Sequence, residues 1–85
     1  MKENWLGLDD KVVVVTGGAS GIGKHVVDTL MQAGAKAVVV DMNVKTGDEL
    51  DGAYCVQCDV TNKDSVQAMA DAVVEKYGRI DALVN

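Results

Sequence analysis

The chain contains two runs of consecutive aliphatic residues, at 11–16 (KVVVVT) and 36–41 (KAVVVD). Both are apolar at successive positions, whereas a strand with one face in water alternates apolar and polar residues. Such runs are typical of strands that are covered on both faces, as in a parallel sheet with helices on either side. The segments 53–59 (AYCVQCD) and 80–84 (IDALV) are predicted to be further strands of the same sheet.

Two segments between these strands repeat apolar residues at the spacing of an amphipathic helix. The first spans 22–33 and is followed by Gly34, and the second spans 62–77 and is followed by Gly78. Glycine at this place commonly ends a helix in the left-handed conformation. Thr61 together with Asp64 is expected to cap the second helix at its start. The connection at 42–52 is near the minimum length for a parallel crossover, so we expect at most a turn or two of helix at 45–50.

The elements therefore follow one another as strand, helix, strand, short crossover, strand, helix, strand. Right-handed crossovers turn this series into an α/β fold with a Rossmann-type parallel sheet. Its strands, counted along the chain, are expected in the spatial order 3-2-1-4, which is the N-terminal half of a doubly wound domain. Because the strand order reverses at the first strand, we expect a ligand crevice above the carboxyl end of residues 11–16.

The composition argues against several kinds of partner. Thirteen acidic residues against eight basic ones give a formal net charge of −5, which disfavours a nucleic-acid surface because such a surface needs Lys and Arg against phosphates. The longest purely aliphatic run covers only 12–15, so we expect neither a secretory signal nor a membrane partner. Two cysteines and no signal fit a reducing compartment, and we expect a cytoplasmic protein.

A glycine-rich loop (TGGASGIG, residues 16–23) lies between the first strand and the first helix. Gly17 is expected to permit the tight turn, Gly21 to let a pyrophosphate approach the backbone, and Gly23 to let helix and strand pack closely. Amides at the start of the helix have no intrahelical partners, so an acidic chain can still bind a phosphate there. Ser20 either caps this helix or contacts phosphate, and the sequence does not separate the two roles. The alternative for the whole loop is a purely structural turn.

The spacing Thr-Gly-x-x-x-Gly-Ile-Gly, with Ile22 before the last glycine, resembles the short-chain dehydrogenase/reductase family. The likeness continues at Asp41 after the second strand, at 58–60 (CDV) and at 83–85 (LVN). It implies an oxidoreductase that transfers a hydride between a nicotinamide cofactor and a secondary alcohol or ketone, as a homo-oligomer when full length. The lead-in at 4–8 (NWLGL) resembles the sugar-alcohol phosphate dehydrogenases of this family.

The same resemblance implies roles for three residues beyond the glycine loop. Asp59 would contact the adenine of the dinucleotide, and Val60 would support the adenine through its backbone. Asn85 would lie beside the adenosine ribose, because it matches the first residue of the family's Asn-Asn-Ala-Gly element.

Asp41 lies 24 residues after Gly17, at the tip of the strand beside the loop. A carboxylate there can accept hydrogen bonds from both hydroxyls of the adenosine ribose, and it would repel a 2′-phosphate. Relatives that prefer NADP usually place a basic residue either at the position of Ser20 or at that of Met42. We therefore predict NAD as the cofactor and count both residues among its contacts. The alternative for Asp41 is a solvated acid that caps a loop.

Four other residues invite a functional reading but are expected to be structural or to pack against a surface. Cys55 and Cys58 lie three residues apart on a predicted strand, so their side chains point to opposite faces and apolar packing is favoured over a redox pair or a metal site. His25 has no acid–base partner at a fixed offset and is expected to be exposed or packed on its helix. Trp5 is expected to cover the lower edge of the sheet or a partner surface.

The family resemblance also implies a catalytic Tyr-x-x-x-Lys pair, which neither tyrosine of this chain can form. Tyr54 is followed four residues later by Cys58, and Tyr77 by Asp81. We therefore name no catalytic residue and interpret 1–85 as an NAD(P)-binding Rossmann portion without the catalytic half. We expect these residues alone to be inactive, and the full-length enzyme to act on a small-molecule substrate. The alternatives are a stand-alone nucleotide-binding module without catalysis and an α/β fragment without a ligand.

Overall fold

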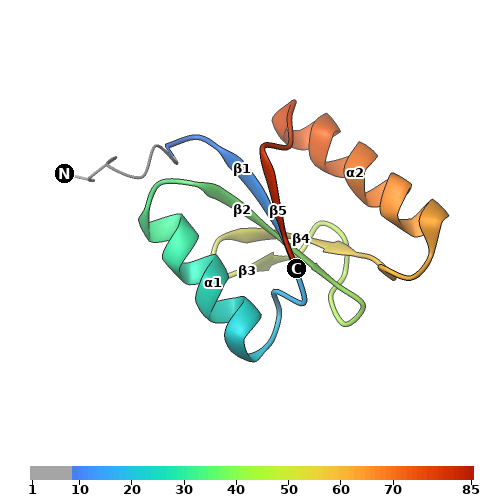
Figure 1. Cartoon of the computed structure of the whole chain (residues 1–85), viewed down its shortest axis with the longest axis horizontal. Helices are drawn as coiled ribbons and strands as arrows, with labels where there is room; N and C mark the ends of the chain where they lie inside the picture. Colours follow the sequence, from blue (N-terminus) through green and yellow to red (C-terminus); the bar gives the residue numbers. More distant parts are fainter. Residues whose placement is uncertain (1–8) are drawn as a thin grey trace.

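The computed structural model describes residues 9–85, which form one sheet with a helix on each face (Figure 1). The strands are β1 (Val12–Thr16), β2 (Lys36–Asp41), β3 (Glu49–Leu50), β4 (Ala53–Gln57) and β5 (Ala82–Val84), and the helices are α1 (Gly21–Gln32) and α2 (Lys63–Tyr77). Neither helix of this part of the chain is long and apolar enough to cross a membrane. Trp5 and the lead-in at 4–8 lie outside the described residues.

The strands lie in the order β3-β4-β2-β1-β5. The neighbours β4, β2, β1 and β5 are parallel, and Val14 of β1 stands opposite both Val38 of β2 and Leu83 of β5. The one antiparallel strand, β3, pairs with β4 at the edge. The predicted Rossmann-type sheet with the order 3-2-1-4 is therefore confirmed, with β3 as an additional strand.

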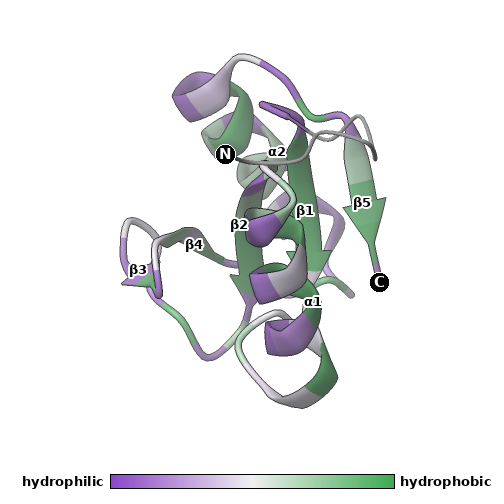
Figure 2. Cartoon of the chain, turned by 90° about the vertical axis from the view of Figure 1, so that its left-hand side faces the viewer, coloured by the Kyte–Doolittle hydropathy of each residue, from purple (hydrophilic) through white to green (hydrophobic). Residues whose placement is uncertain are grey.

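Successive valines of the central strands point alternately into two apolar layers, one beneath each helix. Val14 lies in the layer beneath α2 with Met69 and Val73, and Val15 lies in the layer beneath α1 with Val27. Figure 2 shows β1 and β2 among the most apolar parts of the chain. The other buried members are Val12, Val38, Val40, Val56 and Cys58 on the α2 face, and Val13, Ala35, Ala37, Val39, Ala53 and Cys55 on the α1 face.

The connection between β2 and β4 closes with a hairpin, so the helical turns predicted at 45–50 are wrong. Leu50 of β3 stands opposite Ala53 of β4 in an antiparallel pair. Between them, Asp51 and Gly52 both have positive φ angles, of 52° and 92°. Two such residues in succession form a type I′ turn, whose twist matches that of the flanking strands. The hairpin thus adds a strand to the sheet where a helix would have needed more residues.

Helix α2 begins at a different cap from the one predicted. The side chain of Asn62 accepts a hydrogen bond from the backbone N of Ser65 at 3.0 Å, so Asn62 is the N-cap. Thr61 precedes this cap by one residue, and its hydroxyl donates to the carboxylate of Asp59 at 2.6 Å. The predicted end of the helix is confirmed, since Gly78 adopts the left-handed conformation with φ 83°.

Asp81 connects the chain before β5 to the start of β1. Its Oδ2 accepts a hydrogen bond from the backbone N of Val12 at 2.8 Å, and its own backbone N donates to the Val12 carbonyl at 2.9 Å. Arg79 donates to Oδ1 from Nε at 3.0 Å and also from Nη2. The hydrogen bond from Val12, followed by that from Arg79, holds the pKa of Asp81 below its ordinary value.

Stability is expected to decline at acid pH in a way that Asp81→Asn reduces. The ionised carboxylate stabilises the fold above the unfolded-state pKa of about 3.9, and this contribution is lost as the pH falls through the lower folded-state pKa. Denaturant unfolding at several pH values should therefore show a shallower acid decline for Asp81→Asn than for the wild type. The control Asp71→Asn, at an exposed position of α2, should keep the wild-type decline. Identical pH profiles for all three chains would contradict this role of Asp81.

Candidate functional site

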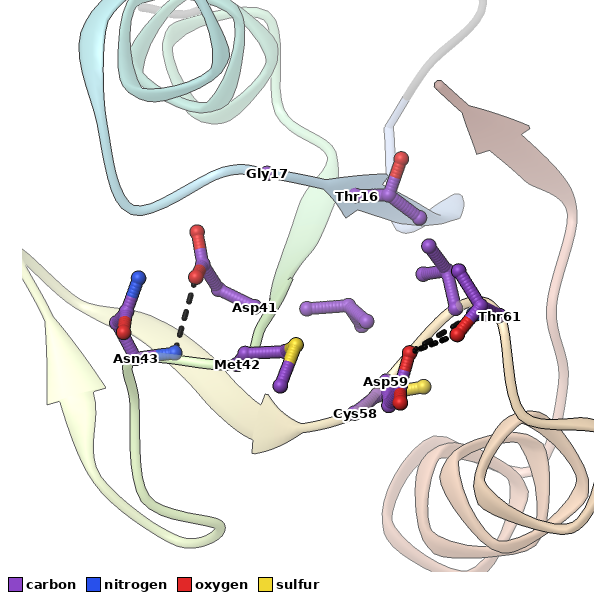
Figure 3. Close-up of a pocket in the computed structure, with 10 residues that line it drawn as sticks. Thr16, Gly17, Asp41, Met42, Asn43, Cys58, Asp59 and Thr61 are labelled. Carbon is purple, nitrogen blue, oxygen red and sulfur yellow. Dashed lines mark hydrogen bonds between the residues drawn. The ribbon is translucent and has the colours of Figure 1, made fainter.

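A groove of about 420 Å³ opens at the carboxyl ends of β1, β2 and β4 (Figure 3). Asp41 and Asn43 lie on one side of it, and Asp59 and Thr61 lie on the other. The strand order reverses at β1, so this is the position at which the sequence predicts a ligand crevice. The lining residues are Thr16, Gly17, Val40, Asp41, Met42, Asn43, Cys58, Asp59, Val60 and Thr61.

The glycine loop leaves β1 through a left-handed residue and then packs against its own helix. Gly17 has a φ of 69°, and its backbone N donates to the carbonyl of Val40 at 2.8 Å. A Cβ at Gly23 would stand only 2.1 Å from the carbonyl oxygen of Gly17. The close packing predicted between helix and strand is therefore a close packing of α1 on the backbone of the loop.

The start of α1 is open to the approach of a ligand. Gly21 has a φ of 50°, and no atom lies within 4 Å of the position that its Cβ would take. Ser20 is the N-cap residue by its extended backbone, but its side chain makes no capping hydrogen bond. Of its two possible roles, capping by the hydroxyl is thus absent, and phosphate contact stays a prediction. Ile22 in the first turn is 84% exposed.

Asp41 ends β2 with its carboxylate held by backbone amides on two sides. Oδ2 accepts a hydrogen bond from the backbone N of Ala19 in the glycine loop at 3.4 Å, and Oδ1 accepts one from the backbone N of Asn43 at 3.0 Å. Each carboxylate oxygen has two lone pairs, so both can still accept from a ligand. Met42, which follows Asp41, is exposed and lines the groove.

Asp59 lies between β4 and α2, and it is held by Thr61 in the same connection and by Ser65 in the first turn of α2. Its Oδ1 accepts hydrogen bonds from the hydroxyl of Thr61 at 2.6 Å and from the backbone N of Thr61 at 3.0 Å. Its own backbone N donates to Oγ of Ser65 at 3.0 Å. The hydroxyl of Thr61, and secondly its amide, lower the pKa of Asp59, so the carboxylate is ionised at neutral pH. Val60 beside it is exposed and lines the groove.

Asn85 lies next to the groove but is not part of its lining. The hydroxyl of Thr16 contacts Oδ1 of Asn85 and donates to the carbonyl of Val84, both at 3.2 Å. Since Thr16 itself lines the groove, Asn85 stands directly behind the wall that β1 provides.

The predicted site residues thus fall into three groups around one groove. Gly17, Asp41, Met42, Asp59 and Val60 line it, Ser20, Gly21, Ile22 and Gly23 form the start of α1, and Asn85 contacts Thr16. Sequence reasoning missed five lining residues: Thr16, Val40, Asn43, Cys58 and Thr61. Two of these carry a signal, because Asn43 and Thr61 each follow an aspartate by two residues, which is the spacing of an Asx-turn.

The two cysteines and the histidine lie as expected. Cys55 and Cys58 are free and buried in the two opposite layers of the core, as the alternation along a strand predicts. Burial raises the pKa of the Cys55 thiol, which suits apolar packing and not redox chemistry. His25 is exposed on α1. Within residues 9–85, no group of three or more His, Cys, Asp or Glu side chains is placed to hold a metal ion.

Comparisons with known protein sequences match this chain to dehydrogenases of one family. The family model described as short chain dehydrogenase matches residues 11–85. Sorbitol-6-phosphate 2-dehydrogenase of Klebsiella pneumoniae is 40% identical over 84 residues, which cover 95% of this chain and 31% of that protein. Fluoren-9-ol dehydrogenase of Terrabacter sp. is 42% identical over 82 residues, which cover 88% of this chain and 23% of that protein. The chain thus spans about a third or less of the length of these relatives.

Solved structures agree with the sequence matches. A C-terminal deletion mutant of Thermoplasma acidophilum aldohexose dehydrogenase matches 95% of this chain and 34% of its own, with a TM-score of 0.84 at 36% identity. A short chain dehydrogenase from Mycobacterium smegmatis matches 99% of this chain and 38% of its own, with a TM-score of 0.83 at 33% identity. The glycine loop, the sheet order and these matches together place the chain in the short chain dehydrogenase family.

Proposed function

We propose that this chain is the NAD-binding portion of a dehydrogenase that, as a full-length protein, transfers a hydride between NAD and a secondary alcohol or ketone. When bound, the nicotinamide would supply the hydride chemistry. The residues of this chain would hold the pyrophosphate and adenosine of the cofactor. Membership of the short chain dehydrogenase family supports an oxidoreductase with a Rossmann nucleotide-binding module.

The start of α1 fits a pyrophosphate. The space beside Gly21 is empty to a distance of 4 Å, so a phosphate can approach the backbone closely. The first-turn amides lack intrahelical partners, and the helix dipole adds partial positive charge at this end. The first turn contains no acidic residue that would repel an anion. An acidic chain can therefore bind the cofactor's phosphates without a lysine or arginine.

The observation that carries the proposal is the carboxylate of Asp41 in the groove. The amides of Ala19 and Asn43 fix its orientation, and each oxygen keeps a lone pair for a hydroxyl of the adenosine ribose. A 2′-phosphate at the same place would meet a negative charge. Ser20 and Met42 offer no cation to compensate for that repulsion. This arrangement favours NAD over NADP.

For the substrate we propose a sugar alcohol or its phosphate. The similarity to the sorbitol-6-phosphate 2-dehydrogenase of Klebsiella pneumoniae supports this class. Other relatives are named for fluoren-9-ol or for 7alpha-hydroxysteroids, so these proteins share this portion of the chain while their substrates differ. Oxidation of sorbitol 6-phosphate by the full-length protein with NAD would test the substrate class, and activity only on steroids or aromatic alcohols would contradict it.

Titration of the 85-residue chain with NAD and with NADP tests the cofactor. NAD should shift backbone amide resonances of the glycine loop and of the residues that line the groove, and NADP should bind about tenfold more weakly because of the charge of Asp41. Amide resonances of the β3–β4 hairpin serve as an internal control, since this hairpin contributes no residue to the groove lining. Equal affinity for the two cofactors would contradict the NAD assignment, and no binding of either would contradict the proposed function.

The second candidate is a nucleotide-binding module without catalysis, and the surroundings of Tyr77 are compatible with it. A tyrosine that acts as an acid or base needs a lowered pKa. Burial raises the pKa of Tyr77, and its ring packs edge to face on Tyr54 at a centroid distance of 6.3 Å. NAD binding without turnover of any alcohol would be expected of the 85 residues under both readings. Turnover by the full-length protein separates them.

A further inference from the structure

The carboxylates of Asp41 and Asp59, on the two sides of the groove, each accept a hydrogen bond from the backbone N of the residue two positions later. The backbone N of Asn43 donates to Oδ1 of Asp41, and the backbone N of Thr61 donates to Oδ1 of Asp59, both at 3.0 Å. Thr61 adds a second donor, because its hydroxyl reaches the same Asp59 oxygen at 2.6 Å (Figure 3). A single residue therefore supplies both hydrogen bonds to one oxygen of Asp59.

This arrangement leaves the other oxygen of Asp59 available. Among the described residues, Oδ2 of Asp59 receives no hydrogen bond. The carboxylate cannot rotate about its last bond without weakening both hydrogen bonds from Thr61, of which the hydroxyl bond is short and charge-assisted. The carboxylate thus presents one negatively charged acceptor in a restricted orientation in the wall of the groove.

An ionised carboxylate only accepts hydrogen bonds, and this property selects what it can recognise on a nucleobase. The exocyclic amine is the donor on the edge of adenine, whereas the ring nitrogens accept. Hypoxanthine carries a carbonyl oxygen in place of that amine, and its donor on this edge is the neighbouring ring N1–H. A carboxylate that is held to meet the amine therefore faces an acceptor in hypoxanthine. A fixed carboxylate in the groove can therefore distinguish the two bases.

We propose that Thr61 is a positioning residue for base recognition, which fixes Asp59 so that its Oδ2 accepts a hydrogen bond from the exocyclic amine of adenine. This inference rests on the proposed NAD-binding function and on the contact between Asp59 and adenine that the family resemblance implies, and it adds to them the residue that orients the carboxylate. Ser65 anchors the backbone of the same segment by accepting from the Asp59 backbone N, but it does not contact the carboxylate.

The first test measures the carboxylate of Asp59 directly and needs no cofactor. Its pKa, followed by the carbon-13 resonance of the carboxyl group, should rise in Thr61→Val and stay low in Thr61→Ser, which keeps a hydroxyl donor. The control Thr29→Val removes a threonine hydroxyl from an exposed position on α1 and should leave the pKa of Asp59 unchanged. The charged groups in the first turn of α2 are Lys63 and Asp64, and Asp41 lies across the groove. All three are the same in every variant.

The second test measures base selectivity with NAD and with its analogue that contains hypoxanthine in place of adenine. The wild type and Thr61→Ser should bind NAD about tenfold more tightly than the analogue, because the analogue has a carbonyl oxygen at the position where the fixed carboxylate accepts from the amine. In Thr61→Val this ratio should fall about threefold, mainly through weaker binding of NAD. Unfolding curves of each variant establish that the chain is folded at the temperature of the titration.

The outcomes separate this inference from the function on which it rests. A wild type that binds neither dinucleotide would overturn the proposed function together with this inference. NAD binding with an unchanged NAD-to-analogue ratio in Thr61→Val would overturn the inference alone, as would an unchanged pKa of Asp59 in that variant. A raised pKa together with a reduced ratio, both restored in Thr61→Ser, would support it.

Discussion

Replacing Gly23 with alanine is expected to destabilise the fold by about 3 kcal/mol, at the upper end of the range for overpacking a close contact. The new Cβ would stand 2.1 Å from the carbonyl oxygen of Gly17 and 2.8 Å from its carbonyl carbon. The opposing atoms belong to the backbone, so no side-chain rotation can make room. Either α1 moves away from the loop or the turn at Gly17 opens. Denaturant unfolding of the wild type and of Gly23→Ala would measure the loss.

Gly21→Ala is the matched control, because it makes the same substitution two residues earlier in the same helix. Its Cβ would meet nothing within 4 Å, although the φ of 50° is unfavourable for alanine. We expect a loss of about 1 kcal/mol from the left-handed conformation. The same Cβ would occupy the space proposed for the pyrophosphate, so NAD binding should weaken more than stability does. Equal destabilisation by the two substitutions would show that the clash at Gly23 is relieved without cost.

Asp41→Ala is expected to weaken NAD binding about tenfold, since it removes the charged acceptor proposed for the ribose hydroxyls. The preference for NAD over NADP should fall by at least the same factor, because the repulsion of a 2′-phosphate disappears as well. Titration of both cofactors against the variant measures the two effects in one experiment. The affinity for NADP should stay the same or rise.

Asp41→Asn separates charge from hydrogen bonding at this position. Asparagine keeps one acceptor oxygen and nearly the same shape, so the loss of NAD affinity should be smaller than for alanine. The repulsion of the 2′-phosphate should be lost to the same extent in both variants. If NAD affinity is unchanged in Asp41→Ala, the ribose assignment is wrong. A preference for NAD that survives in both variants would place the discrimination elsewhere.

The regular elements could be predicted because their patterns are local. Consecutive valines indicated strands covered on both faces, and the helices end at Gly34 and Gly78, which both have positive φ angles. The prediction for the crossover is wrong because it considers only the length of the segment, while the Asp51-Gly52 pair is a strong signal for a hairpin turn. That pair belongs to the same eleven residues, 42–52. Turn chemistry therefore outweighed segment length in this connection.

The candidate site could be predicted only where a motif marks it. The loop glycines and Asp41 follow from spacing, but the contacts that orient the carboxylates do not. Thr61 was expected to cap α2, whereas its hydroxyl bonds to Asp59 and leaves the cap to Asn62. Thr61 and Asn62 both carry a side-chain oxygen that can cap a helix, and a sequence pattern cannot say which of them the folded chain brings to the amide of Ser65. The site is thus predictable in its residue types and less so in its hydrogen bonds.

The four valines at 12–15 have a consequence for how β1 finds its place in the sheet. If β1 slid by one residue against β2, valine would replace valine on both faces, so the apolar side chains barely oppose such a slip. The two ends of the strand must provide the difference. At one end Asp81 accepts from the backbone N of Val12, and at the other Gly17 donates to the carbonyl of Val40. The hydrogen bonds of Asp81 and Gly17 thus fix the register of β1, and this register sets how far Thr16 and the loop after it extend into the groove.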